Sequence, residues 1–307
     1  MAGLSFKKIL TVISEVRAGS GAAARLCVVG EGPAVRDVAR SLSAGAADAV
    51  DGFSASLDVL GPADMPHEAG LLRRWRLVVL VAPGCDAAGA ARVVSALRAA
   101  RVGVVALVPD RDTPAGSAWL AAAGLKHAES VASLGRPGEP KPSLQGRLAT
   151  VLEGDGLALA QRLPALRHAV ADRIVLAAAR QNGVIGVVVI VPGADMPAMT
   201  LNQIRMVLRI ATVYGEELGL DRALEILSVA GAGLMFRTLA RQALDFVPGF
   251  GWAVKGAVGF SGTVALGSAA IEYFEAGAPL TTTRFTKLAG TVDRFRRVLP
   301  FRGVAAG

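Results

Sequence analysis

Residues 25–43 read RLCVVGEGPAVRDVARSLS, an apolar run followed by a glycine turn and an amphipathic helical pattern. Downstream, Val- and Leu-rich runs alternate with helical patterns in the same way. Further strands are expected at 77–82, 102–108 and 130–134, and further helices at 87–101 and 115–124. Continuous apolar strands that alternate with helices are typical of a parallel sheet covered on both faces. Residues 24–135 are therefore predicted to form a three-layer, Rossmann-like α/β domain.

The rest of the chain is predicted to be mostly helical. Residues 1–23 contain an amphipathic helix at 4–17, and residues 136–146 are a linker with three prolines. Residues 147–279 are predicted to form an all-α domain rich in Gly and Ala, and residues 280–307 a basic amphipathic tail. Helices are expected at 147–180, with a break near 154–156 as an alternative, and at 201–218, 220–229, 234–246 and 251–275.

Charge and composition point to an anionic partner. The net charge is +8, and only 5% of the residues are aromatic. Nucleic-acid modules usually interleave aromatic side chains with a basic patch, and this sequence has no such run. The expected partner is therefore a membrane or anionic lipid, with no nucleic acid. Cys27 and Cys85 form no CxxC motif and are predicted to be buried thiols in a reducing cytoplasm. No metal is expected, because the histidines lack metal-ligand spacing.

The two ends of the chain carry basic residues among apolar ones, a pattern that favours binding at an anionic membrane surface. The same pattern is also compatible with solvated helices that dock on their own domain. The basic residues assigned to the membrane surface are Lys7, Lys8, Arg284, Lys287, Arg294, Arg296 and Arg297.

A phosphate loop would lie at the turn between the first strand and the first helix, because backbone N–H groups at a helix N-terminus bind phosphate. When the GxxxxGK[ST] pattern is aligned on Gly30, its last three positions fall on Val35, Arg36 and Asp37. Val35 places a branched side chain where the backbone approaches phosphate. Asp37 replaces a magnesium-binding hydroxyl with a carboxylate that repels phosphate. The sequence thus predicts no hydrolysis of GTP or ATP.

Two other residue sets follow the order of a GTPase. Asp58–Gly61 spell DxxG, and Asp112 follows the third predicted strand, where a base-reading aspartate would lie. The domain therefore resembles a G domain that has lost its nucleotide chemistry. An unrelated doubly wound domain and a working NTPase are the alternatives. The vestigial nucleotide-site residues are Gly30, Gly32, Arg36, Asp58, Gly61 and Asp112. No cofactor is expected, and GTP is the one nucleotide that this resemblance leaves open.

Small residues recur along 251–271, a spacing that lets helix backbones approach closely. The stretch has about the length needed to span a bilayer, although Lys255 lies inside it. A compact soluble bundle is the alternative. The nine apolar residues at 183–191 are too few to span and are predicted to form a buried hairpin or re-entrant segment. The predicted helix-packing residues are Ala253, Ala257, Gly259, Ser261, Thr263 and Gly267.

The runs VPGADMPAMTLNQIRMVLRIATVYGEELGL (191–220) and RTLARQALDFVPGFGWAVKGAVGFSGTVALGSAAIEYFE (237–275) resemble domain-of-unknown-function family 697. The residues that carry the resemblance are Pro192, Asp195, Pro197, Gln203, Met206, Tyr214, Gly215, Pro248, Gly249, Gly251, Thr263 and Gly267. The family is typified by YcjF-like bacterial inner-membrane proteins and is often attached to, or encoded beside, Era-like GTPases. The resemblance implies a location at the cytoplasmic face of the inner membrane, with the cytoplasm as the alternative.

These observations together favour a non-enzymatic, membrane-associated protein that acts as a scaffold or regulatory partner. In this interpretation a G-like domain is joined to a helical module. The small-residue faces of the helices would bind a protein partner or a second copy of the chain. A GTPase with an atypical phosphate loop and a soluble helical interaction protein remain as alternatives.

Overall fold

The chain divides into two compact units, which are described separately. The computed structural model describes residues 6–20, 24–132, 143–152, 156–188, 196–216 and 251–276. One unit comprises residues 15–173 together with 212–216, and the other comprises the remaining described residues. The predicted tail and the helices expected at 220–229 and 234–246 lie outside the described residues.

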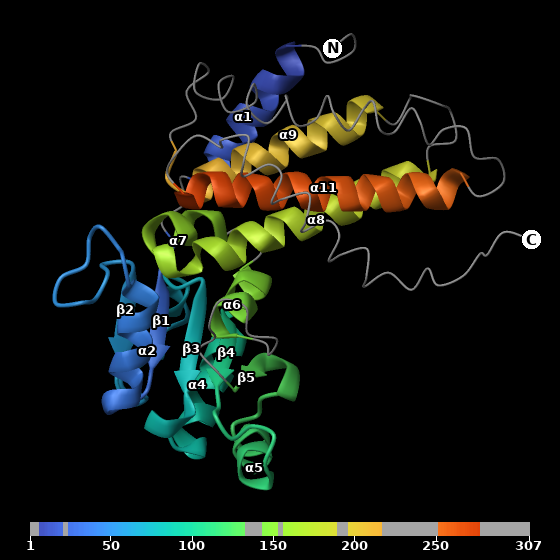
Figure 1. Cartoon of the computed structure of the whole chain (residues 1–307). Coiled ribbons are helices and arrows are strands. Elements are labelled where there is room, and N and C mark those ends of the chain that lie inside the picture. The colour runs from blue at the N-terminus through green and yellow to red at the C-terminus, as the bar shows by residue number, and fades with distance from the viewer. Residues whose placement is uncertain are drawn as a thin grey trace, which may run out of the picture. The chain divides into compact units, whose positions relative to one another are not determined.

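The first unit contains a parallel sheet of five strands in the order β2-β1-β3-β4-β5 (Figure 1). The strands are β1 (Leu26–Val29), β2 (Leu57–Leu60), β3 (Leu77–Val81), β4 (Gly103–Leu107) and β5 (Ser130–Val131). The central strand β1 pairs with β2 on one side and with β3 on the other, so that Leu26 lies beside both Leu57 and Leu77. The chain moves outward in one direction after β1 and in the other direction after β3. The order of the strands therefore reverses between β1 and β3.

Helices cover both faces of this sheet. They are α2 (Pro33–Ser43), α3 (Ala69–Leu72), α4 (Ala87–Ala100), α5 (Pro114–Ala122), α6 (Leu144–Leu152) and α7 (Gly156–Arg162), with short 3-10 helices η1 (Ala82–Gly84), η2 (His127–Glu129) and η4 (Pro164–Leu166). Helices α3, α4 and α5 pack side by side, whereas α2 and α6 both contact η4, and α6 lies on β3 and β4. The predicted three-layer α/β class is confirmed.

Burial follows from the alternation of side chains along the strands. Strand β3 is buried at all five positions, as expected for a central strand covered on both faces. Val78 and Leu80 join the core under α3, α4 and α5, together with Trp75, which is 1% exposed. On the amphipathic α2, Val35, Val38 and Leu42 form the buried side, which explains why residues 33–43 fold as a surface helix.

Two elements of this unit were not expected from the sequence. Strand β2 lies at the edge of the sheet, where its side chains are only partly buried, and α3 is a single turn. The pattern at 147–180 is divided, because α6 ends at Leu152 and α7 begins at Gly156. The alternative that places a break near 154–156 is therefore correct.

Long helices make up the second unit. They are α9 (Met196–Val213) and α11 (Gly251–Ala276), together with the first part of α1 (Phe6–Ser20) and the part of α8 (Arg167–Val188) that follows Arg173. Residues 183–188 continue α8, and Val184 and Val188 are 61% and 66% exposed. The prediction of a buried hairpin or re-entrant segment at 183–191 is thus wrong for residues 183–188. Among the described helices, none combines the length and apolar character needed to cross a bilayer.

Candidate functional site

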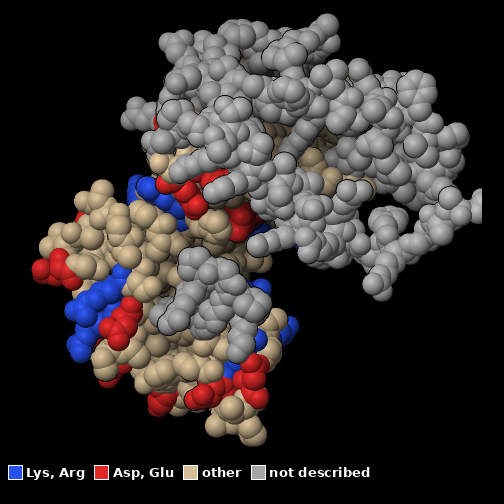
Figure 2. All heavy atoms as spheres, viewed as in Figure 1, with Lys and Arg blue, Asp and Glu red and all other residues tan. Residues whose placement is uncertain are grey.

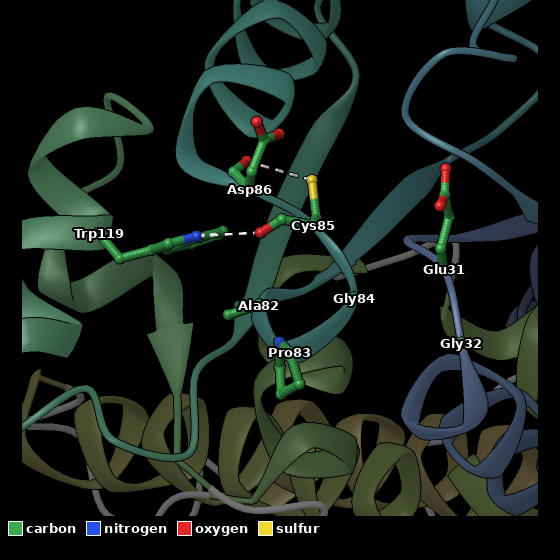
Figure 3. A pocket seen from close by; sticks show the side chains of 8 residues that line it. All are labelled: Glu31, Gly32, Ala82, Pro83, Gly84, Cys85, Asp86 and Trp119. Atoms are coloured by element: carbon green, nitrogen blue, oxygen red, sulfur yellow. Dashed lines mark hydrogen bonds between the residues drawn. The ribbon is translucent and has the colours of Figure 1, made fainter.

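A shallow hollow of about 650 Å³ opens at the carboxyl ends of β1 and β3. Its lining residues come from the β1–α2 turn, from η1 and the start of α4, and from α5: Glu31, Gly32, Ala82, Pro83, Gly84, Cys85, Asp86 and Trp119 (Figure 3). In open parallel sheets, ligands bind at the point where the strand order reverses. The fold therefore places the candidate site where a doubly wound domain would hold a nucleotide.

The backbone of the β1–α2 turn is already hydrogen-bonded within the protein. Glu31 N donates to Gly84 O at 2.6 Å, and Gly30 N donates to Leu60 O at 3.0 Å. In a phosphate loop such amides point at the ligand instead. The N–H group of Glu31 is thus used to join the β1–α2 turn to η1, and that of Gly30 continues the pairing of β1 with β2.

This joining depends on the absence of side chains at two positions. A Cβ on Gly30 would lie 2.8 Å from Val35 Cγ2, and one on Gly84 would lie 2.7 Å from the same methyl group. Gly30 also has a φ of 147°, in the region that favours glycine. Val35 Cγ2 therefore occupies the space beside both glycines.

The hollow carries negative charge at the ends of two helices. Glu31 precedes Gly32, the N-cap of α2, and Asp86 caps α4 by accepting a hydrogen bond from Gly89 N at 2.8 Å. The positive end of the α4 dipole thus faces the carboxylate of Asp86, and Glu31 adds a second carboxylate to the lining. None of the eight lining residues is Lys or Arg. The arrangement disfavours a phosphate group and lacks the cation that a P-loop lysine supplies.

Cys85 is the one side chain in the lining that could act as a nucleophile. Burial raises its pKa to about 11, and the charges of Asp86 and Glu31 act in the same direction against a smaller effect of Arg92. Its carbonyl oxygen accepts a hydrogen bond from Trp119 Nε1 at 3.0 Å (Figure 3). A thiol with a raised pKa is protonated at neutral pH and reacts slowly, so the geometry does not make Cys85 a nucleophile.

The structure brings together only part of the predicted nucleotide site. Gly30 and Gly32 lie at the hollow, and a Cβ on Gly61 would lie 3.3 Å from Glu31 Oε1, so Gly61 is close by. Arg36 is exposed on α2 and does not line the hollow. Asp112 lies in the loop after β4, and its Oδ1 is 2.9 Å from His127 Nε2. Both side chains are more than half exposed. Asp112 therefore belongs to a separate surface pair.

Asp58 is placed at the opposite end of the sheet, which corrects the role that the DxxG interpretation gives it. It is the second residue of β2, and its carboxylate accepts hydrogen bonds from Arg25 Nη2 at 2.6 Å and from Trp75 Nε1 at 2.6 Å. Arg25 and Trp75 precede β1 and β3, so this cluster lies at the amino ends of the strands. Asp58 and Gly61 cannot hold one magnesium ion and its phosphate from opposite ends of β2.

In the helical unit, the structure separates the two predicted small-residue stripes of α11. Gly259 and Gly267 face α8: a Cβ on Gly259 would lie 2.8 Å from Asn182 O, and one on Gly267 would overlap the methyl groups of Val175. Ala257 and Ser261 are exposed on the same helix. The side chain of Ala253 is outside the described part.

Four buried polar side chains meet between α8, α9 and α11. Asn182 and Thr263 are 0% exposed, and Asn202 and Gln203 are each 8% exposed. Asn202 and Gln203 lie on α9, and Asn182, which the sequence did not single out, lies on α8. The local sequence gives no signal for Asn182, because it follows the polar residues Arg180 and Gln181. Thr263 Oγ1 donates to Gly259 O at 2.7 Å and accepts from Asn182 Nδ2 at 2.8 Å and from Gln203 Nε2 at 3.1 Å.

Charge on the visible surface is mixed. Figure 2 shows basic and acidic side chains close to one another among a majority of uncharged residues on this face. Lys7 and Lys8 belong to α1, and the five basic residues predicted in the tail lie outside the described ranges. Across the described residues, no group of three or more His, Cys, Asp or Glu side chains is placed to hold a metal ion.

The sheet order and the following helices define a doubly wound α/β domain joined to a helical domain. Residues 156–295 match the model of the family described as domain of unknown function (DUF697), so the helical part of the chain is a domain of that family. The resemblance to family 697 is confirmed. No curated protein and no solved structure matches the chain.

Proposed function

We propose that this chain is a non-enzymatic, membrane-associated protein in which a G-like α/β domain without nucleotide chemistry is joined to the DUF697 domain. In this proposal it acts as a scaffold or regulatory partner at the cytoplasmic face of the inner membrane. The observation that carries the first half is the hydrogen bond of 2.6 Å from Glu31 N to Gly84 O, with Glu31 and Asp86 as the charged residues of the lining.

The hydrogen bond and the charges around it each oppose nucleotide binding. A phosphate at the turn would have to break it, and the carbonyl of Gly84 would then lose its donor in a partly buried place. The phosphate would also meet Glu31 and Asp86 with no basic side chain in the lining. The functional groups at the hollow are two carboxylates, an indole and a protonated thiol. These groups suit contacts with a partner better than phosphoryl transfer.

The membrane half of the proposal rests on charge and sequence. The chain carries a net charge of +8, and its last segment places Arg294, Arg296 and Arg297 next to Phe295. Each basic residue near an anionic surface contributes about 1 kcal/mol, and the attraction falls off within a Debye length. A few such residues acting together are enough for reversible surface binding without a spanning helix.

Nucleotide binding is tested by titrating the purified full chain with a fluorescent guanine nucleotide and Mg²⁺, with turnover measured in parallel. We expect no saturable binding in the micromolar range and no phosphate release above background. Arg36→Ala is the informative variant, because Arg36 takes the P-loop lysine position. Binding or turnover that Arg36→Ala abolishes would overturn the first half of the proposal.

Membrane association is tested by co-sedimentation with vesicles of phosphatidylcholine alone or with phosphatidylglycerol, at low and high salt. Arg294→Gln, Arg296→Gln and Arg297→Gln together should weaken binding to the anionic vesicles at low salt. A control of equal charge change replaces Arg36, Arg92 and Arg180, which are exposed on α2, α4 and α8. Equal loss in both triple variants would assign the effect to net charge. No binding by the parent chain would favour a soluble interaction protein.

A further inference from the structure

Three arginines lie at the amino-terminal edge of the sheet, opposite to the edge that carries the hollow. Arg73 and Arg74 precede β3, and Arg101 precedes β4. Because β3 and β4 are neighbouring parallel strands, their amino ends lie side by side. Arg73 Nε also donates to Ala100 O at 3.3 Å, which places the Arg73 side chain beside residue 101. Arg73, Arg74 and Arg101 are called the arginine edge below.

The helical turn of α3 and the residues after it direct two of these arginines outward. Leu72 and Trp75 lie three residues apart and are each 1% exposed, so they form the buried side of the turn. Leu71, Arg73 and Arg74 lie on the other side and are exposed, and Leu71 is 48% exposed. An exposed leucine is thus found next to two exposed arginines.

Contacts within the protein hold the guanidinium groups of Arg73 and Arg74 in place. Arg73 is fixed by its hydrogen bond to the carbonyl of Ala100. The guanidinium carbon of Arg74 lies 4.2 Å from the centre of the Trp75 ring, in a cation–π contact. Trp75 is held in turn by the carboxylate of Asp58. A side chain that is already ordered loses less entropy when it binds an anion, so these contacts favour binding.

Neighbouring carboxylates leave the positive charge of the arginine edge largely uncompensated. Asp58 is already shared between Arg25 and Trp75. Within the described part of the chain, none of the three arginines of the edge forms an ion pair. Residues 67–76 contain three arginines and one acid, Glu68. This edge of the sheet therefore combines positive charge with exposed apolar surface.

We propose that the arginine edge and Leu71 form a docking surface for an anionic membrane, so that the α/β domain itself contacts lipid. This inference rests on the membrane association proposed above and adds a second contact to that of the basic residues at 294–297. Guanidinium groups bind lipid phosphate through paired N–H donors, and an exposed leucine adds apolar area that enters the interface. A nucleic acid fits less well, because the aromatic side chain of this turn, Trp75, is buried and cannot stack on a base.

Co-sedimentation of the full chain with vesicles of phosphatidylcholine and phosphatidylglycerol at low salt tests the arginine edge. Arg73→Gln, Arg74→Gln and Arg101→Gln together should weaken binding about tenfold or more. Lysine at the same three positions keeps the charge and should keep most of the binding. The control is the triple glutamine variant at positions 36, 92 and 180, which has the same net charge and should bind more tightly than the edge variant. Circular dichroism checks that all variants are folded.

A fluorescent reporter locates the contact without removing a charge. Leu71→Cys, labelled with an environment-sensitive dye, should shift its emission to shorter wavelength on phosphatidylglycerol vesicles at low salt. Ala115→Cys is the matched site, because residue 115 is exposed on the first turn of α5, which follows the carboxyl end of β4. It should show no shift. Cys27 and Cys85 are buried, and the parent chain treated with the dye gives their background.

The outcomes separate this inference from the proposed function. If the tail variant at 294–297 weakens binding but the glutamine variant of the edge binds as its control does, the arginine edge is not a contact and membrane association still stands. If the parent chain binds no vesicles, both proposals fail. A dye at position 71 that shifts no more than one at 115 would show that the edge does not face lipid. Loss of affinity for a single-stranded oligonucleotide, with vesicle binding unchanged, would assign the edge to nucleic acid instead.

Discussion

The carboxylate of Asp58 and the indole nitrogen of Trp75 are 2.6 Å apart, and the Trp75 side chain is 1% exposed. Asp58 belongs to the edge strand β2, and Trp75 lies just before β3 on the other side of β1. Arg25, just before β1, binds the second carboxylate oxygen at 2.6 Å. One carboxylate thus connects the amino ends of three neighbouring strands.

Removal of this carboxylate should destabilise the α/β unit. Asp58→Ala leaves the buried indole N–H of Trp75 without its acceptor, and we expect the free energy of unfolding to fall by about 1–3 kcal/mol. Urea denaturation followed by tryptophan fluorescence measures the change. Asp37→Ala, at an exposed position on α2, is the control and should stay within about 0.5 kcal/mol of the parent. Equal loss in the two variants would contradict this account of Asp58.

The ionisation of Asp58 should make the stability of the fold depend on pH. Burial by itself would raise the pKa of Asp58, but hydrogen bonds from Arg25 and Trp75 and the charges of Arg25 and Arg74 outweigh it and lower the pKa. A carboxyl whose pKa is lower in the folded than in the unfolded chain stabilises the fold above its unfolded pKa of about 3.9, and this contribution is lost as the pH falls through the folded pKa.

The measurement compares the parent with Asp58→Asn in urea at pH 7, 5, 4 and 3. We expect the parent to be the more stable of the two at pH 7 and the difference to shrink below about pH 4, because protonated Asp58 resembles asparagine in charge. A difference that stays constant down to pH 3 would show that ionisation of Asp58 does not contribute.

The two thiols should be unreactive in the folded chain. Burial is the main cause that raises the pKa of Cys27 to about 12 and that of Cys85 to about 11. At pH 8, a rise in thiol pKa from 9.0 to about 11 reduces the thiolate fraction about 100-fold, and alkylation by iodoacetamide should slow at least as much. Mass spectrometry of timed samples, with the urea-unfolded chain as reference, gives the rates. Rapid labelling of Cys85 in the folded state would show that the hollow activates it.

We expect that the contact with Val175 leaves no room for a large side chain at position 267. A Cβ on Gly267 would lie against Val175, whose Cβ is 3.0 Å away, so Gly267→Leu should overpack the helix pair and cost about 1–3 kcal/mol or more. Gly267→Ala combined with Val175→Ala should cost less than the two single changes added together, because the second change makes room for the first. Thermal unfolding of the four proteins provides the cycle. Additive costs would mean that the two residues do not share this space.

Gly262 provides a control on the same helix. A Cβ at Gly262 would meet no atom within 4 Å, so Gly262→Ala should be neutral or slightly stabilising, since alanine favours helix. A large loss of stability at Gly262 would show that the cost at Gly267 reflects the helix itself and not the contact with Val175.

Most of the α/β framework could be predicted from the sequence, because β1, β3 and β4 are continuous apolar runs and α2 and α4 have clear periodicity. Strand β2 could not, since an edge strand of four residues with an aspartate in it lacks that apolar continuity. Its last three residues, Asp58–Leu60, match a nucleotide motif together with Gly61 by spelling alone. Only the pairing of Asp58 with Arg25 and Trp75 shows that the carboxylate lies at the other end of the strand.

The polar cluster of the helical unit shows a different limit of sequence reasoning. Asn182 and Thr263 are 81 residues apart, and neither has a local partner that would single it out as part of a network. Small residues on α11 predicted close packing, but they recur along more than one stripe of the helix. The choice between them depends on the facing residues of α8 and α9, which periodicity along α11 does not contain.

The shared space at Gly30, Val35 and Gly84 has a consequence for evolution. The methyl group of Val35 lies beside both glycines, but a Cβ on Gly84 would also overlap the backbone oxygen of Glu31, so a smaller residue at 35 would not make room for a side chain at 84. Among relatives that keep this α/β domain, glycine is therefore expected to persist at position 84. Substitutions at 35 to 37 alone would not create a phosphate loop here, because the carbonyl of residue 84 would still hold the amide of residue 31. A phosphate site at this turn would therefore need more than one mutation at a time.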